Sequence, residues 1–116
     1  MERTSEKWKD MKYNKLVRDK IPTIIRKSGK KFSMHVATQQ EYEEALWRKL
    51  DEEISEFKED VCEDEAADVL EVLNAIMAFY GYNLYDVETT RQIKADARGA
   101  FEDRIILEEV FDKWMW

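Results

Sequence analysis

The chain has 116 residues, 44% of them apolar and 39% charged, which suits one domain with one hydrophobic core. Its formal net charge of −7 argues against a general nucleic-acid binder, because such proteins normally carry a basic face. Gly and Pro are scarce, at three and one residues, so there is little room for a many-stranded sheet and we expect helices to form the bulk of the fold.

Cysteine content and targeting signals indicate the compartment. Cys62 is the only cysteine, which excludes an intrachain disulfide and fits a reducing environment. The first residues, MERTSEKWKD, lack the apolar core of a signal peptide. No apolar run approaches the ~20 residues that a membrane-spanning helix needs. We therefore expect a cytoplasmic protein with no membrane partner.

We predict one short helix in the N-terminal third of the chain. Residues 1–12 are largely charged and are expected to be flexible. A stretch rich in lysine and arginine follows, YNKLVRDKIPTIIRKSGKK, in which Pro22 is placed to open a helix and Gly29 to end it. Residues 31–38, KFSMHVAT, alternate loosely between apolar and polar and predict a short extended piece.

Three longer helices are predicted after residue 38. Thr38 and Glu41 form a capping-box pattern at the start of a helix over 39–59. Its apolar stripe consists of Tyr42, Leu46, Leu50, Ile54 and Phe57. A second helix, over 65–80 with Asp64 as its cap, is apolar nearly all round and should be the most buried element. A third spans 84–98 and ends at Gly99, and the tail has helical spacing of apolar residues from Ile105 to Trp114. No repeat or linker divides the chain, so we expect a single domain over 1–116.

Carboxylates recur along the apolar faces of the first two long helices. On a helical wheel Glu53 falls inside the apolar stripe, Glu56 lies at its edge and Glu52 points further out. On the second helix, Glu65 and Asp68 share a face, because residues three apart are neighbours on a helix. If the two helices pack antiparallel through these faces, the two pairs of acids meet.

A bound cation would resolve the conflict that these acids create. Several carboxylates do not stay ionised together in an apolar groove unless a partner offsets their charge. Oxygen ligands suit magnesium, manganese or calcium, and no Cys/His cluster indicates zinc. Since magnesium keeps open positions for water and phosphate oxygens, phosphate chemistry is predicted. The alternative is a solvated acidic helix face, which is common on protein surfaces.

A phosphate substrate also needs basic residues. The candidates are Arg18, Lys20, Lys94, Arg98 and Arg104. Lys94 and Arg98 are four residues apart and would form one patch on the third long helix. His35 is the only histidine, and we assign it a structural role rather than a catalytic one.

Two acidic motifs and their surroundings resemble a known family. EEISE (52–56) matches an E-E-x-x-E element and EAAD (65–68) an E-x-x-D element. In order, YNKLVRDKIP, YEEALWRKLDEEISEF, EAADVLEVLNA and KADARGAFEDRIIL resemble the MazG-like all-α nucleoside triphosphate pyrophosphohydrolases, in their phosphoribosyl-ATP pyrophosphohydrolase-like branch. The resemblance covers about residues 13–107. The gap between the two acidic elements is short for the superfamily, and EEVFDKWMW matches none of its motifs.

The resemblance implies a function and a set of residues. It implies a helical bundle in which an antiparallel helix pair holds magnesium, and hydrolysis of a nucleoside triphosphate to the monophosphate and pyrophosphate in house-cleaning of non-canonical nucleotides. The metal ligands carry over as Glu53, Glu56, Glu65 and Asp68. Glu52 would be a supporting acid or a water-orienting base beside Glu53, and Lys94, Arg98 and Arg18 would hold phosphates.

Two further expectations concern assembly and the competing functions. Three modest helices cover one core poorly, so we expect a homodimer or a higher homo-oligomer. The alternative to a pyrophosphohydrolase is a non-catalytic nucleotide- or metal-binding helical adaptor. A second alternative is a hydrolase of another polyphosphate, such as phosphoribosyl-ATP or a signalling nucleotide.

Overall fold

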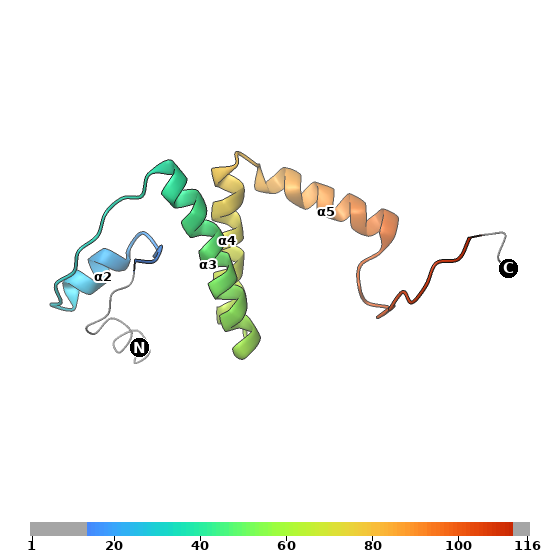
Figure 1. Cartoon of the computed structure of the whole chain (residues 1–116), viewed down its shortest axis with the longest axis horizontal. Helices are drawn as coiled ribbons and strands as arrows, with labels where there is room; N and C mark the ends of the chain where they lie inside the picture. The colour runs from blue at the N-terminus through green and yellow to red at the C-terminus, as the bar shows by residue number, and fades with distance from the viewer. Residues whose placement is uncertain (1–13, 113–116) are drawn as a thin grey trace. The chain divides into compact units, whose positions relative to one another are not determined.

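The computed structural model describes residues 14–112, and this part of the chain is all-helical, with four helices and no strand. The helices are α2 (Ile21–Lys27), α3 (Gln39–Glu59), α4 (Glu63–Phe79) and α5 (Leu84–Arg98), as Figure 1 shows. The all-α prediction is confirmed for these residues. The chain divides into two compact units, residues 1–81 and 82–116, and whether they form one domain stays a prediction. The expected flexibility of residues 1–12 falls outside the described residues.

Helix α2 begins and ends close to the predicted positions. Pro22 lies in its first turn, where the missing N–H is not needed. Ser28 is the C-cap, and Gly29 follows with φ +84°, a left-handed conformation that glycine adopts without a Cβ clash. Residues 31–38, where a short extended piece was predicted, contain neither helix nor strand.

Helix α3 has the predicted bounds, and helix α4 begins earlier than predicted. The Thr38 hydroxyl accepts a hydrogen bond from the backbone N–H of Glu41 at 3.2 Å, which confirms the cap. The N-cap of α4 is Cys62, without a side-chain hydrogen bond, so the assignment of Asp64 as the cap was wrong. Asp64 lies instead in the first turn with other acids, where carboxylates interact favourably with the positive end of the helix dipole.

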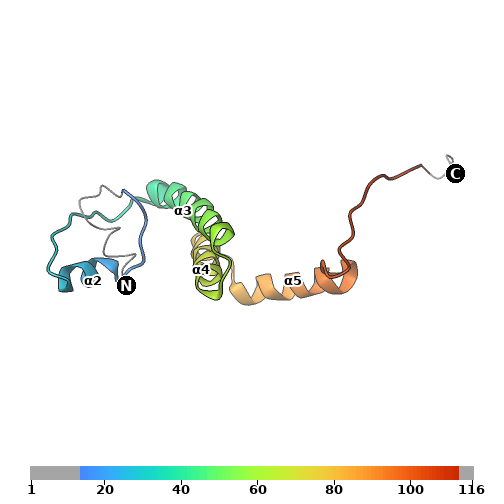
Figure 2. The same cartoon turned by 90° about the horizontal axis from the view of Figure 1, so that it is seen from below.

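Helices α3 and α4 form an antiparallel hairpin in the first unit. They lie side by side in Figures 1 and 2, and the Tyr42 ring near the start of α3 meets the Phe79 ring at the end of α4, with centroids 5.6 Å apart. Leu46 and Ile76 are the buried apolar residues of the described chain. These residues form the apolar core of the hairpin.

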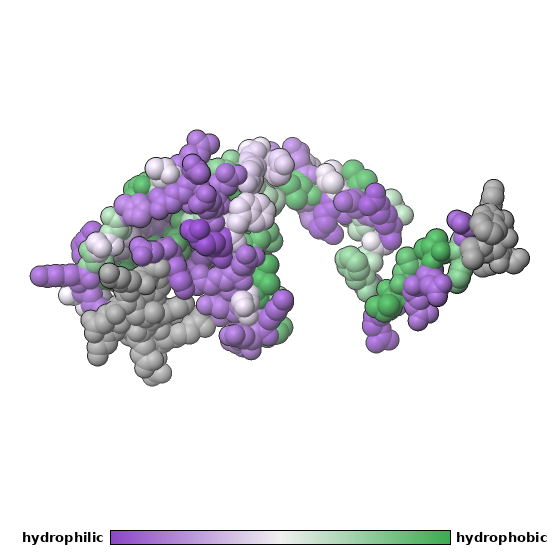
Figure 3. Space-filling view, viewed as in Figure 1, coloured by the Kyte–Doolittle hydropathy of each residue, from purple (hydrophilic) through white to green (hydrophobic). Residues whose placement is uncertain are grey.

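Helix α4 leaves apolar side chains exposed within a single chain. Leu70 and Leu73 are 57% and 38% exposed, and Figure 3 shows apolar surface along this edge of the hairpin. The reason is that, within residues 14–81, only α3 packs on α4 and it covers one side of this helix.

The second unit consists of α5 and the segment that follows it. The Asn83 side chain accepts a hydrogen bond from the backbone N–H of Tyr85 at 2.7 Å, and Gly99 ends the helix with φ +84°. Residues 104–112 form no helix, so the prediction from their spacing is wrong over the described residues. Ile105 and Val110 are exposed there, and apolar spacing alone does not stabilise a helix that has no packed face. Within residues 14–112, no helix has both the length and the apolar character to span a membrane.

Candidate metal centre

Three carboxylates from α3 and α4 converge near the turn of the hairpin. Glu53, Glu65 and Asp68 each offer one oxygen, and these oxygens all lie within 4.8 Å of one another. Glu53 is one of the buried residues because it lies seven residues after Leu46, on the same apolar stripe of α3. Glu65 and Asp68 are three apart on α4, with Glu65 buried and Asp68 half-buried. We call these three residues the carboxylate cluster.

The environment of Glu53 disfavours its ionised form. Burial raises the pKa of Glu53, and the nearby charges of Glu56 and Asp68 raise this pKa further, whereas Lys49 lowers it. The Oε2 atom of Glu53 is buried and has no hydrogen-bond partner among the described residues. A buried carboxylate oxygen without a donor costs free energy, so this atom is a position where a cation would stabilise the protein.

Lys49 lies beside the cluster, although the sequence did not predict it as a site residue. Its Nζ atom is 3.3 Å from Oε1 of Glu53 and 3.6 Å from Oε2 of Glu52. Lys49 precedes Glu53 by four residues on the same helix, and this spacing is the signal that would have identified it.

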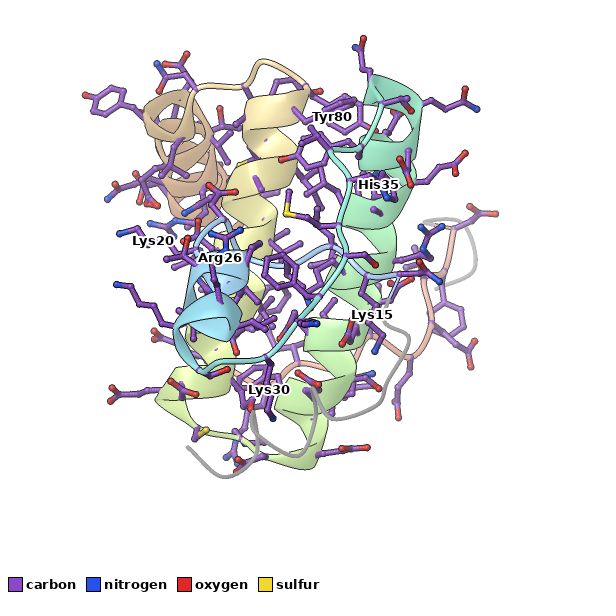
Figure 4. All side chains as sticks on the ribbon, turned by 90° about the vertical axis from the view of Figure 1, so that its left-hand side faces the viewer. Lys15, Lys20, Arg26, Lys30, His35 and Tyr80 are labelled. Carbon is purple, nitrogen blue, oxygen red and sulfur yellow. The ribbon has the colours of Figure 1, made fainter. Side chains whose placement is uncertain are left out.

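Two cations approach from residues 14–20, which we call the basic segment. Lys15 Nζ donates a hydrogen bond to Oε1 of Glu52 at 3.3 Å, and Arg18 Nη2 donates one to Oδ1 of Asp68 at 2.8 Å. Arg18 was a predicted phosphate ligand, and the structure places it directly on one of the clustered carboxylates. Figure 4 shows Lys15 on the α3 side of the hairpin and Lys20 near the start of α2. No short-range spacing indicates Lys15, because it is 37 residues from its partner.

The structure brings some of the predicted site residues together and leaves others apart. Glu52, Glu53, Glu65, Asp68 and Arg18 are joined by the contacts above. Glu56 is partly exposed and is not one of the three clustered acids, although its charge acts on Glu53.

Lys94 and Arg98 belong to α5, in the second unit, and their contact with a substrate phosphate stays a prediction. A hollow of about 770 Å³ lies in that unit, between Arg98 and the residues that follow it as far as Ile106. None of the three clustered carboxylates lines this hollow, and its walls are mostly exposed loop residues, so it does not mark the predicted site.

The open end of the hairpin has a different, fully paired polar network. Trp47 Nε1 donates a hydrogen bond to the Tyr80 hydroxyl at 3.0 Å, and this hydroxyl donates to Oε2 of Glu43 at 2.6 Å. His35 Nε2 lies 2.8 Å from Oε2 of Glu41, an exposed pair at the start of α3, and this contact lowers the pKa of Glu41. None of these hydrogen bonds includes a residue of the carboxylate cluster, in keeping with a structural role for His35.

The chemistry of the cluster fits a hard divalent cation. All three potential ligand atoms are carboxylate oxygens on helices, the type of ligand that magnesium and manganese prefer. In the described part of the chain, Oε2 of Glu53 has no hydrogen-bond partner that would compete with a metal ion. No protein-family model matches the chain, and no curated protein or solved structure shows significant similarity to it. Membership of the MazG-like superfamily therefore stays a prediction from the sequence motifs.

Proposed function

We propose that this protein is a magnesium-dependent nucleoside triphosphate pyrophosphohydrolase, which cleaves between the α- and β-phosphates to give the monophosphate and pyrophosphate. The observation that carries the proposal is the convergence of Glu53, Glu65 and Asp68, two of them buried, from paired helices. The order of acidic motifs EEISE and EAAD supports the same reaction class.

The carboxylate cluster would hold Mg²⁺, and Mn²⁺ would also suit these ligands. Glu53, Glu65 and Asp68 are the ligands nearest one another, and Glu56 is a further acid one turn along α3 from Glu53. When bound, the metal neutralises phosphate charge and lowers the pKa of a coordinated water. Its charge would also offset the raised pKa of Glu53, since an adjacent cation favours the carboxylate form.

The other residues of the site would act on water and on phosphate charge. Glu52 is held by Lys15 and Lys49, at 3.3 and 3.6 Å, and would act as a base that orients water toward the α-phosphorus. In the proposed step the water oxygen bonds to this phosphorus, the water proton passes to Glu52, and the bond to the bridging oxygen breaks. Arg18 would meet the charge of the leaving pyrophosphate.

The experiment is release of pyrophosphate from canonical, deoxy and damaged nucleoside triphosphates in the presence of Mg²⁺. We expect monophosphate and pyrophosphate in equal amounts, with turnover in Glu53→Gln reduced by about 100-fold or more, as for loss of roughly 2.7 kcal/mol of transition-state stabilisation. A preference for damaged nucleotides would support the house-cleaning role.

Glu44→Gln is the matched control, because Glu44 is an exposed acid on the same helix. It should keep full activity. Full turnover by Glu53→Gln would refute the site. Absence of release from every nucleotide would favour another polyphosphate substrate or a binding module.

We also propose that the protein is a homodimer or a higher homo-oligomer. The exposed apolar face of α4 at Leu70 and Leu73 supports this assembly, since burial of such side chains in a second copy would stabilise the complex. Light scattering coupled to size exclusion should give a mass of at least twice 13.9 kDa. A single species at the monomer mass would contradict the proposal.

A further inference from the structure

The basic segment spans the two helices that supply the carboxylate cluster. Lys15 contacts Glu52 on α3 and Arg18 contacts Asp68 on α4, so two side chains three residues apart bridge the hairpin. The backbone here is neither helix nor strand, and Asn14 has φ +45°, a conformation that Asn tolerates better than most residues. Behind the segment, the N–H of Ile21 bonds to the carbonyl of Arg18 at 3.1 Å, which ties its end to the start of α2.

Two cations of this segment, Lys15 and Arg18, have solvent-accessible side chains. The side chains of Arg18 and Lys15 are 57% and 49% exposed, whereas that of Lys49 is only 21% exposed. Ion pairs this exposed are weak, because water solvates both partners. Arg18 and Lys15 can therefore leave their carboxylates at little cost.

Arg18 and a metal ion would compete for the same carboxylate. The Asp68 side chain that receives the Arg18 hydrogen bond is also a member of the cluster with Glu53 and Glu65. A divalent cation at the cluster would repel the guanidinium and weaken its attraction to Asp68. Phosphate oxygens brought to the same site would give the guanidinium a new partner, since its planar fork matches phosphate geometry.

We propose that the basic segment is a phosphate-binding strap whose cations exchange partners: Arg18 and Lys15 neutralise Asp68 and Glu52 in the metal-free protein and bind substrate phosphates once metal occupies the cluster. This inference rests on the proposed function, because it assigns the residues that hold the phosphates at that site. It adds Lys15 to the phosphate ligands, and it makes the metal-free ion pairs a resting state of the site.

If Arg18 exchanges partners, its removal should shift the affinities for Mn²⁺ and for pyrophosphate in opposite directions. A purely structural role for Arg18 would not produce this pair of shifts. In Arg18→Met the competitor for Asp68 is gone, so Mn²⁺ alone should bind about two- to fivefold more tightly, the range expected from an exposed ion pair. With Mn²⁺ saturating, inorganic pyrophosphate should bind roughly tenfold or more weakly, because a charge-assisted contact is lost. Both constants are measured by titration calorimetry, without turnover.

Lys27→Met is the matched control. It removes the same charge from an exposed residue in the last turn of α2, outside the basic segment. It should leave both affinities within about twofold of the wild-type values, as for a surface change away from the site. Arg18→Lys keeps the charge but not the fork, and should recover only part of the pyrophosphate affinity.

The outcomes separate the two proposals. Weaker Mn²⁺ binding by Arg18→Met would show that Arg18 supports the metal ligands and would overturn the exchange, as would unchanged pyrophosphate affinity. If wild-type protein shows both binding events and the opposite shifts but hydrolyses no nucleotide, the strap stands and the proposed reaction fails. If wild-type protein does not bind Mn²⁺, both proposals are overturned.

Discussion

The two ends of the α3–α4 hairpin bury opposite kinds of side chain. At the open end, Leu46 and Ile76 are buried and the Tyr42 and Phe79 rings meet edge-on, whereas near the turn the buried residues are Glu53 and Glu65. Burial of leucine and isoleucine stabilises a fold, whereas burial of carboxyl groups costs free energy unless partners offset it. The open end therefore holds the helices together, whereas the turn end carries a cost that a bound cation would offset.

The polar groups at the two ends differ in the same way. At the open end, the indole N–H of Trp47, the hydroxyl of Tyr80 and the carboxylate of Glu43 form a continuous chain of hydrogen bonds. Near the turn, one oxygen of Glu53 is buried without a hydrogen-bond partner in the described chain. A polar network of the first kind is complete without a ligand, and a group of the second kind needs one.

The largest expected effect on stability is at the apolar end. Leu46→Ala should lower the free energy of unfolding by about 2–5 kcal/mol, because it removes buried methyl groups and leaves a cavity. Urea denaturation without added metal measures this change. Val61→Ala is the control, since Val61 is 76% exposed in the turn, and it should change stability by less than about 0.5 kcal/mol. Equal effects of the two substitutions would contradict the assignment of the core.

At the acidic end, urea denaturation should show a gain in the free energy of unfolding when Glu53 is replaced by Gln. Burial, with the charges of Glu56 and Asp68, raises the pKa of Glu53, so the native state disfavours its ionisation relative to the unfolded state. Below pH about 4.3, the ordinary pKa of a glutamate, the buried carboxyl group is protonated and costs little. The free energy of unfolding falls as the pH rises through the raised pKa of Glu53 in the native state. In EDTA, Glu53→Gln should therefore gain stability relative to wild type between about pH 4 and pH 7, a range set by that ordinary value.

Metal addition distinguishes this effect from a general change in the fold. Mg²⁺ at 100 times its dissociation constant should stabilise wild-type protein by about 2.7 kcal/mol and should stabilise Glu53→Gln much less. A difference between the two proteins that does not vary with pH would argue against an ionisation penalty at Glu53. Equal stabilisation of both by Mg²⁺ would place the ion elsewhere.

Local signals in the sequence predicted the helices well where caps determine their ends. Thr38 marks the start of α3 and Gly99 the end of α5, because each residue acts on the backbone of its own turn. The start of α4 was misplaced because several acids in a row compete for the same role, and the local pattern does not rank them. The helix predicted beyond residue 104 failed because spacing does not show whether a packing surface exists.

The candidate site was predictable in part. The position of Glu53 on the apolar stripe of α3 followed from helical periodicity, and the structure buries it. The depth of Glu65 did not follow, because α4 is apolar on most sides and its wheel has no unique inward face. The contacts of Lys15 and Arg18 span 37 and 50 residues, so they depend on how the basic segment folds back over the hairpin, which periodicity does not encode.

The smallest expected effect tests the paired network at the open end. Trp47→Phe keeps an aromatic ring and removes the indole N–H that donates to Tyr80, so it should lower the free energy of unfolding by about 0.5–1.5 kcal/mol. The loss is modest because the Tyr80 hydroxyl keeps its hydrogen bond to Glu43 and lies near solvent. Urea denaturation measures it, and Mg²⁺ should stabilise this variant as much as wild type, since Trp47 contacts none of the clustered carboxylates. A loss of the Mg²⁺ effect in Trp47→Phe would show that the two ends of the hairpin are coupled, and the division of the hairpin into a stabilising end and a binding end would then be wrong.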